Sequence, residues 1–190
     1  MHYRSYRFLT PLIMVLTWAN MEAQTSHPVP RLVVNVTIDQ LRTDYMEAFS
    51  SLFGAGGFNK VMRDGRSYMD AAYPFSHIDR ASAVACIMTG TVPYDNGIVG
   101  GRWMDRKTLR PMYCVDDTAC EGWLTSEKYS PVALNVSTVT DELKMATGGR
   151  ALVYSIAPDA DAAILAAGHA ADGAFSVSYT HLTLPTTSRV

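Results

Sequence analysis

The residue best placed for chemistry is Asp39, which directly follows the apolar run Leu32–Ile38. This run is rich in β-branched residues and is bounded by Pro30, a pattern that favours a strand buried on both faces of a parallel sheet. In open α/β sheets, ligands bind where strands end, and a carboxylate there is a hard oxygen donor for a divalent cation. The alternative is that Asp39 caps a helix beginning at Leu41. Spacing alone leaves both roles open.

Segments with helical spacing alternate with apolar runs along the chain. Glycines and a Thr-Gly-Thr motif end the helical segments, as helix stops commonly do. Such alternation predicts an α/β fold, in which a doubly wound, mostly parallel sheet is flanked by helices. We expect helices at 41–53, 58–63, 80–88 and 136–145, strands at 32–38, 67–73 and 151–156, and a long surface excursion at 97–129.

The stretch Leu32–Tyr45, LVVNVTIDQLRTDY, resembles the opening of the alkaline phosphatase superfamily, particularly its phosphate-irrepressible and type I phosphodiesterase-like members. The likeness continues in the family's order over nearly all of Arg31–Phe175. A combination of motifs is more specific than any one short motif. The other matching motifs are Gly56-Gly57-Phe58, Thr89-Gly90-Thr91 with Pro93, Gly97-Ile98-Val99-Gly100, Trp103, Ala167-Gly168-His169-Ala170-Ala171 and Gly173-Ala174-Phe175.

The resemblance implies an alkaline phosphatase-like mixed sheet, here incomplete, and cleavage of phosphate esters through a covalent phospho-enzyme. It also implies two divalent metal ions, commonly zinc, which would activate the nucleophile and offset charge on the phosphoryl group. Asp39 matches the family's first metal ligand, and the other Asp and His ligands belong to later family segments. His169 lies in a matching motif, but a lone histidine is more often structural than a ligand.

The nucleophile position departs from the family, which has a Thr or Ser at the amino end of the helix before Thr-Gly. Counting along the pattern from the two flanks lands on Arg80 or on His77, and neither can form an alkoxide. Ser82 is therefore the expected catalytic residue, with Ser76 as the alternative. A serine at a helix start lies where the positive end of the helix favours binding of phosphate. The other interpretation is that Ser82 caps or lines the helix.

Positions that clasp phosphate in the family also differ. The family's Asn is Gly101 here, and its Lys and Arg fall on Asp159 and Asp161. Two carboxylates in place of two cations would repel a phosphate dianion. The family's mechanism for phosphate monoesters therefore cannot be assigned to this chain in full.

Two functions follow from these residues. The first is a metal-dependent hydrolase of phosphoric, or related sulfuric or phosphonic, esters through a covalent intermediate, with a small-molecule anionic ester as substrate. The alternative is a non-catalytic binding or sensing protein that keeps the hydrolase fold. A nucleic-acid partner is not expected, because 16 Lys and Arg against 18 Asp and Glu give a net charge of −2 and leave no basic stretch.

The amino terminus has the order of a secretory signal. Arg4 and Arg7 precede the apolar run Phe8–Trp18, which is too short to span a bilayer comfortably. We expect a signal peptide at 1–23, export to the periplasm or the cell exterior, and no stable membrane anchor. In an oxidising compartment Cys114 and Cys120 could form a disulfide, or they could remain two thiols.

The carboxyl terminus breaks the pattern of the preceding chain. Ser176–Val190 is rich in Ser and Thr and has no hydrophobic period. It resembles translated adapter sequence, so we expect a non-native read-through tail at 176–190. The amino-terminal part of an alkaline phosphatase-like domain is expected to occupy 24–175.

Overall fold

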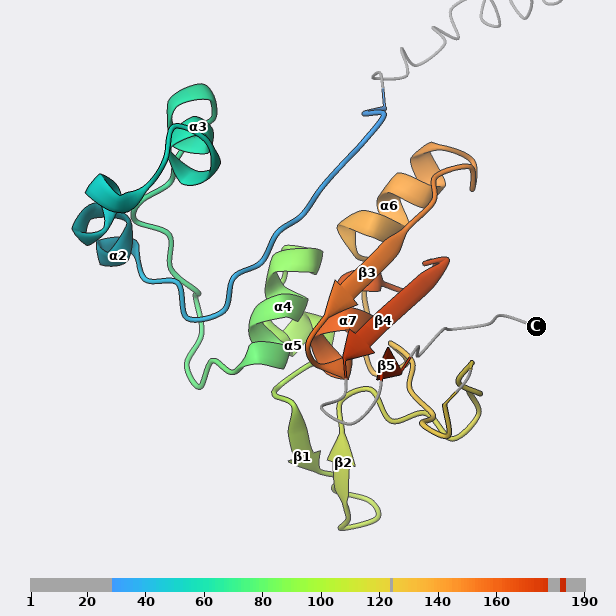
Figure 1. The fold of residues 1–190 in the computed structure, drawn as a ribbon. Coiled ribbons are helices and arrows are strands. Elements are labelled where there is room, and N and C mark those ends of the chain that lie inside the picture. Colours follow the sequence, from blue (N-terminus) through green and yellow to red (C-terminus); the bar gives the residue numbers. More distant parts are fainter. Residues whose placement is uncertain (1–28, 124, 178–181, 184–190) are drawn as a thin grey trace, which may run out of the picture. The chain divides into compact units, whose positions relative to one another are not determined.

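The computed structural model describes residues 29–123, 125–177 and 182–183 (Figure 1). The chain divides into two units, Met1–Val34 and Asn35–Val190, and the helices and strands named below belong to the second. In the first unit, residues 29–34 are exposed and form no helix or strand. The predicted signal peptide at 1–23 lies outside the described residues. None of the helices in the described part of the chain is long and apolar enough to cross a membrane.

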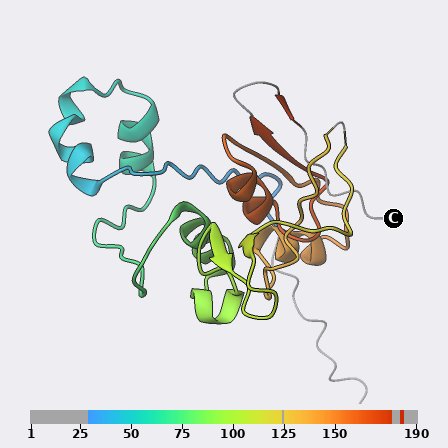
Figure 2. The ribbon, with the colours of Figure 1, turned by 90° about the horizontal axis from the view of Figure 1, so that it is seen from below.

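A small sheet and two helices supply most of the hydrophobic core of the second unit (Figures 1 and 2). β3 (Tyr154–Ala157) and β4 (Gly173–Val177) are parallel, and β5 (Leu182–Thr183) runs antiparallel to β4. α7 (Ala160–Ala167) connects the two parallel strands, and α4 (Arg80–Thr89) packs against α7. This β-α-β unit confirms the predicted alternation of strands and helices.

Alanines allow α4 and α7 to approach closely. Ala81 and Ala85 on α4, like Ala163 and Ala167 on α7, are spaced four residues apart and therefore share one helix face. All four are buried, and removal of such apolar surface from water drives the packing. The hydrophobic core consists of Ala81, Val84, Ala85, Met88, Ile98, Cys114, Val115, Leu134, Ala163, Ile164, Leu165, Ala167 and Ala174.

Between α4 and β3 the chain forms a short helix, a hairpin and a longer helix. α5 (Pro93–Asn96) starts with proline at its first position, where the missing N–H costs nothing. β1 (Arg102–Met104) pairs antiparallel with β2 (Pro111–Tyr113) inside the stretch expected to be a surface excursion. α6 (Val139–Ala146) confirms the helix predicted at 136–145.

The helix predicted at 41–53 is divided into α2 (Thr43–Ala48) and the 3-10 helix η1 (Ser50–Leu52). At the break, the hydroxyl of Ser50 donates a hydrogen bond of 2.8 Å to the carbonyl of Glu47, a local side-chain contact of the kind that competes with helical hydrogen bonds. α3 (Gly57–Asp64) follows and confirms the helix predicted at 58–63.

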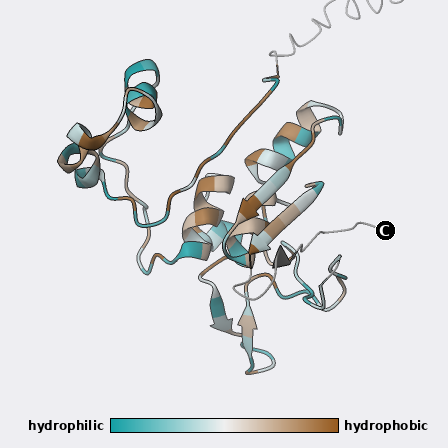
Figure 3. Cartoon of the chain, viewed as in Figure 1, coloured by the Kyte–Doolittle hydropathy of each residue, from teal (hydrophilic) through white to brown (hydrophobic). Residues whose placement is uncertain are grey.

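The strands predicted at 32–38 and 67–73 are not formed among the described residues. Leu32–Ile38 is extended and exposed, with Leu32 at 79% and Val36 at 73% exposure, and Figure 3 shows much of it in hydrophobic colours. A hydrophobic pattern sets the tendency to extend, but a strand also needs a neighbouring ladder to satisfy its backbone groups. The described residues supply no such ladder for either segment.

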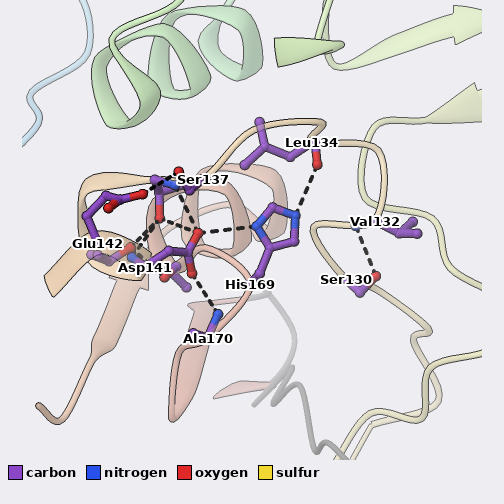
Figure 4. A network of polar contacts seen from close by, with 11 residues as sticks. Ser130, Val132, Leu134, Ser137, Asp141, Glu142, His169 and Ala170 are labelled. Atoms are coloured by element: carbon purple, nitrogen blue, oxygen red, sulfur yellow. Dashed lines mark hydrogen bonds and ion pairs between the residues drawn. The ribbon is translucent and has the colours of Figure 1, made fainter. Parts of the chain in front are cut away.

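A network of polar contacts joins the start of α6 to the loop after α7 (Figure 4). The Thr138 hydroxyl accepts a hydrogen bond from the Asp141 N–H, and the Asp141 carboxylate accepts one from the Thr138 N–H, which makes a reciprocal cap. Asp141 also accepts from the Ala170 N–H at 2.7 Å. The ring nitrogens of His169 lie 3.2 Å from Asp141 Oδ2 and 3.0 Å from the Leu134 carbonyl. This histidine therefore links the loop after α7 to α6 and to the segment at Leu134.

We predict that Gly168→Ala destabilises the protein by about 2–4 kcal/mol. Gly168 has φ +80°, and an added Cβ would collide with the Thr138 hydroxyl and the Asp141 carboxylate. Gly168 also has ψ −170°, a backbone region that essentially only glycine adopts, which adds to the cost of the substitution. Gly149→Ala is the control for a positive φ without a collision, because Gly149 also has φ +80° but its added Cβ meets nothing within 4 Å. The control is expected to cost about 1–2 kcal/mol in urea unfolding. Equal losses in the two variants would contradict the collision.

Candidate functional site

Asp39 lies in an exposed turn that follows the extended run Leu32–Ile38, and the next residue, Gln40, has φ 58°. The capping alternative for Asp39 is not observed, because α2 starts at Thr43 and its cap residue is Arg42. Its role as a metal ligand stays a prediction. In residues 29–123, 125–177 and 182–183, no three His, Cys, Asp or Glu side chains gather as a metal site. The described residues therefore offer one candidate donor and do not by themselves form a zinc site.

Ser82 is fully buried in the first turn of α4. Its hydroxyl lies 2.8 Å from Asp79 Oδ1 and 3.0 Å from the Asp79 N–H, while its own N–H donates to the same carboxylate at 2.9 Å. This is a reciprocal cap, which is the alternative role that the sequence left open. Ser76 lies in an exposed bend before the helix. Nucleophilic roles for Ser82 and Ser76 both stay predictions.

The three charged residues that depart from the family pattern come together in space. The Arg80 guanidinium binds Asp161 through Nε at 3.1 Å and Nη2 at 3.2 Å, and its Nη1 lies 2.9 Å from Asp159. The Asp161 side chain is 3% exposed, whereas that of Arg80 is 39% and that of Asp159 is 46% exposed. The pair Arg80–Asp161 is thus a partly buried, two-point contact of the kind that arginine forms well.

Backbone groups hold the carboxylates around Arg80. Asp79 Oδ2 accepts a hydrogen bond from the Gly101 N–H, and Asp161 Oδ1 accepts one of 2.7 Å from the Ala162 N–H. Burial raises the pKa of Asp79, but hydrogen bonds from Ser82 and Gly101 outweigh it and leave that pKa below its ordinary value. Asp79 is therefore a carboxylate at neutral pH.

Gly101 lies against both the Asp79 and the Asp161 carboxylates. A Cβ at this position would lie 3.5 Å from Asp79 Oδ2 and 3.6 Å from Asp161 Oδ2. A longer side chain would enter the space between the two carboxylates. The absence of a side chain at Gly101 therefore leaves room for its N–H to donate to Asp79 while Asp161 lies on the other side.

Tyr113 supports the cluster from the hairpin. Its hydroxyl accepts a hydrogen bond of 3.2 Å from the Asp161 N–H, and the Arg102 guanidinium lies 4.7 Å from its ring centre. Burial, and then the nearby Asp161 carboxylate, raise the pKa of Tyr113 to about 12. Tyr113 is thus a neutral phenol that orients the start of α7.

Cys114 follows Tyr113 and is fully buried. Burial, followed by the charges of Asp161 and Asp79, raises the pKa of its thiol to about 12. Cys114 and Cys120 are free thiols in the structure, so the possible disulfide between them is not formed. A buried thiol of this pKa has little thiolate at neutral pH and is a core residue.

The cluster lies where a ligand site is expected in an α/β fold. β3 ends at Ala157, and Asp159 is the cap residue of α7. Ligands in such folds bind beyond the carboxyl ends of parallel strands. Asp79, Arg80, Asp159 and Asp161, which we call the charge cluster, carry three carboxylates against one guanidinium, a net charge of −2.

A family model described as type I phosphodiesterase / nucleotide pyrophosphatase matches residues 33–180. The chain belongs to this family, which is part of the alkaline phosphatase superfamily. It is 40% identical over 149 residues to alkaline phosphatase PhoV of Synechococcus elongatus, which covers 77% of the chain and 27% of PhoV. It is 31% identical over 173 residues to alkaline phosphatase PafA of Elizabethkingia meningoseptica, covering 89% of the chain and 32% of PafA.

A crystal structure of wild-type alkaline phosphatase PafA matches with a TM-score of 0.76 and 32% identity. The match covers 83% of the chain and 31% of the PafA chain. The predicted alkaline phosphatase-like α/β fold is therefore confirmed, with an incomplete sheet. The chain spans about a quarter to a third of the length of these relatives.

We predict that Asp161→Asn destabilises the protein by about 1.5–3 kcal/mol, because a buried charged hydrogen-bond acceptor of Arg80 is lost. Asp159→Asn is the matched control at the other end of the same guanidinium. Its side chain is half exposed, so we expect a loss below about 1 kcal/mol. Urea unfolding of the two variants and the parent measures both values. A larger loss for the Asp159 variant would contradict the order of burial.

Proposed function

We propose that the protein is a metal-dependent hydrolase of phosphoric esters, or of related sulfuric or phosphonic esters, that acts through a covalent intermediate. The observation that carries this proposal is the family match over 33–180, which includes Asp39 at the end of the apolar run Leu32–Ile38. PhoV and PafA, the relatives compared above, are both named alkaline phosphatases. The expected substrate is a small anionic ester, and the expected cofactor is a pair of divalent ions such as zinc.

In this proposal Asp39 supplies one carboxylate ligand from an exposed turn. A divalent ion held there would supply positive charge that offsets charge on the phosphoryl group. An exposed carboxylate is accessible to a cation, and its oxygen chemistry suits one. The described residues support this one position and no further ligand.

Ser82 is the proposed nucleophile, with Ser76 as the alternative. Asp79 Oδ1 lies 2.8 Å from the Ser82 hydroxyl, a distance at which a base can accept a proton. However, the lowered pKa of Asp79 makes it a weak base, and the full burial of Ser82 separates its hydroxyl from solvent. Attack by Ser82 would therefore require α4 to open at its first turn, whereas Ser76 is already exposed.

Export to the periplasm or the cell exterior is part of the same proposal. It is supported by the order of charged, apolar and small residues at 1–23. A nucleic-acid substrate is not proposed, because the chain has a net charge of −2.

The charge cluster favours a second candidate function, a non-catalytic binding or sensing protein. Arg80 stands at one of the two positions that the family pattern indicates for a hydroxyl nucleophile, and its guanidinium is bound to Asp161 and Asp159. An arginine held in this way cannot act as a nucleophile. The fold would then bind a ligand without turning it over.

Substitution of Asp39 separates the two candidates. We expect Asp39→Asn in the protein from the complete gene to lower release of nitrophenol from aryl phosphate or aryl sulfate by about 100-fold or more, because a metal ligand is lost. Asp44→Asn is the control, because Asp44 is an exposed carboxylate five residues away that pairs with Arg42. Its activity is expected to match the parent.

One result would count against the role of Asp39, and another would count against catalysis. Equal turnover by the Asp39 variant and the parent would exclude Asp39 as a catalytic metal ligand. Absence of turnover in metal-replete parent protein on all of these esters would favour the non-catalytic candidate.

A further inference from the structure

The amino ends of α4 and α7 meet beside Arg80, and such a place would ordinarily attract an anion. Each helix start carries partial positive charge and N–H donors that point outward. Arginine adds a planar fork of donors that suits phosphate as well as carboxylate. Arg80 is 39% exposed, so solvent reaches its guanidinium.

Carboxylates of the chain itself engage these donors. Asp79 accepts from the Ser82 N–H of α4 and from the Gly101 N–H, and Asp161 accepts from the Ala162 N–H of α7. Asp161 and Asp159 together bind the three nitrogens of the Arg80 guanidinium. The Arg80 guanidinium and the N–H groups of Ser82, Gly101 and Ala162 are therefore paired with carboxylates of the chain, and the charge cluster has a net charge of −2.

The two aspartates that hold Arg80 differ in how firmly they do so. The Asp161 side chain is 3% exposed, and it accepts a hydrogen bond from the Ala162 N–H. The Asp159 side chain is 46% exposed, and although Asp159 is the cap residue of α7, its carboxylate accepts no hydrogen bond from the N–H groups of that helix. Replacement of either carboxylate by the isosteric amide keeps the size of the side chain but removes one negative charge and one of the two oxygen acceptors. Replacement of both changes the net charge of the cluster from −2 to 0.

We propose that Asp159 and Asp161 are specificity-determining residues, which hold Arg80 and exclude phosphate dianions from the carboxyl end of β3. The inference rests on the proposed function, because it states that the ester site disfavours phosphate groups that carry two negative charges. The two aspartates act through Arg80 and through like-charge repulsion, which is strong where water is partly excluded.

The test is binding of inorganic phosphate, measured by calorimetry at pH 8 and low ionic strength on the protein from the complete gene. The protein is treated with EDTA, so that binding does not depend on a metal ion. We expect Asp159→Asn/Asp161→Asn to bind phosphate at least 10-fold more tightly than the parent. Adding Arg80→Gln to the double variant is expected to abolish the gain, because the freed guanidinium is what binds.

Several outcomes overturn the inference. One is that the parent protein binds phosphate as tightly as the double variant. Another is that the gain in phosphate affinity remains after Arg80→Gln is added. If the double variant loses its cooperative thermal transition, Asp159→Asn alone decides, because its exposed side chain leaves the fold intact. This variant is expected to bind at least 2-fold more tightly than the parent, and unchanged affinity would overturn the inference.

The binding test and the turnover test fail separately. Parent protein without esterase activity would contradict the proposed function but leave the phosphate gain measurable. Active protein whose aspartate variants gain no phosphate affinity would support the hydrolase and refute the role of Asp159 and Asp161.

Discussion

The contact between Arg80 and Asp161 is the constraint on which the rest of this site depends. It joins the first residue of α4 to the first turn of α7 across 81 residues of sequence. The Asp161 carboxylate is almost completely buried, and a buried charge without a partner is costly. Asp159 shares the guanidinium of this contact, and the Tyr113 hydroxyl accepts a hydrogen bond from the Asp161 N–H. The two helices therefore meet at a fixed point beyond the end of β3.

Sequence signals predicted the helices and strands whose ends are marked by local residues such as glycine. The helix expected at 80–88 is α4 at Arg80–Thr89, and Gly90, with φ 68°, ends it as the Thr-Gly-Thr motif indicated. The strand expected at 151–156 is β3, shifted by up to three residues. α7 was not predicted, because apart from Asp161 its alanine-rich sequence is apolar on all sides and shows no helical period. The strand at 32–38 was wrong for a different reason, since its formation depends on a neighbour that pattern alone does not supply.

The candidate site was only partly predictable. The family pattern marked Arg80 as a departure at the nucleophile position and Asp159 with Asp161 as departures at the cation positions, without a link between the two. Their opposite signs were the signal that could have suggested pairing, but contact across 81 residues requires the fold. In the structure the three changes form one arrangement, in which the arginine that stands near the expected nucleophile is held by the carboxylates that replace the cations. The metal role of Asp39 and the nucleophilic roles of Ser82 and Ser76 stay predictions.

A double-mutant cycle between Arg80 and Asp161 tests the central claim most directly. Unfolding free energies of Arg80→Gln, Asp161→Asn, the double variant and the parent give the coupling between the two side chains. If the contact joins α4 to α7 as described, the coupling is about 1 kcal/mol or more in favour of the pair. Additive losses, with a coupling within about 0.3 kcal/mol of zero, would contradict the account.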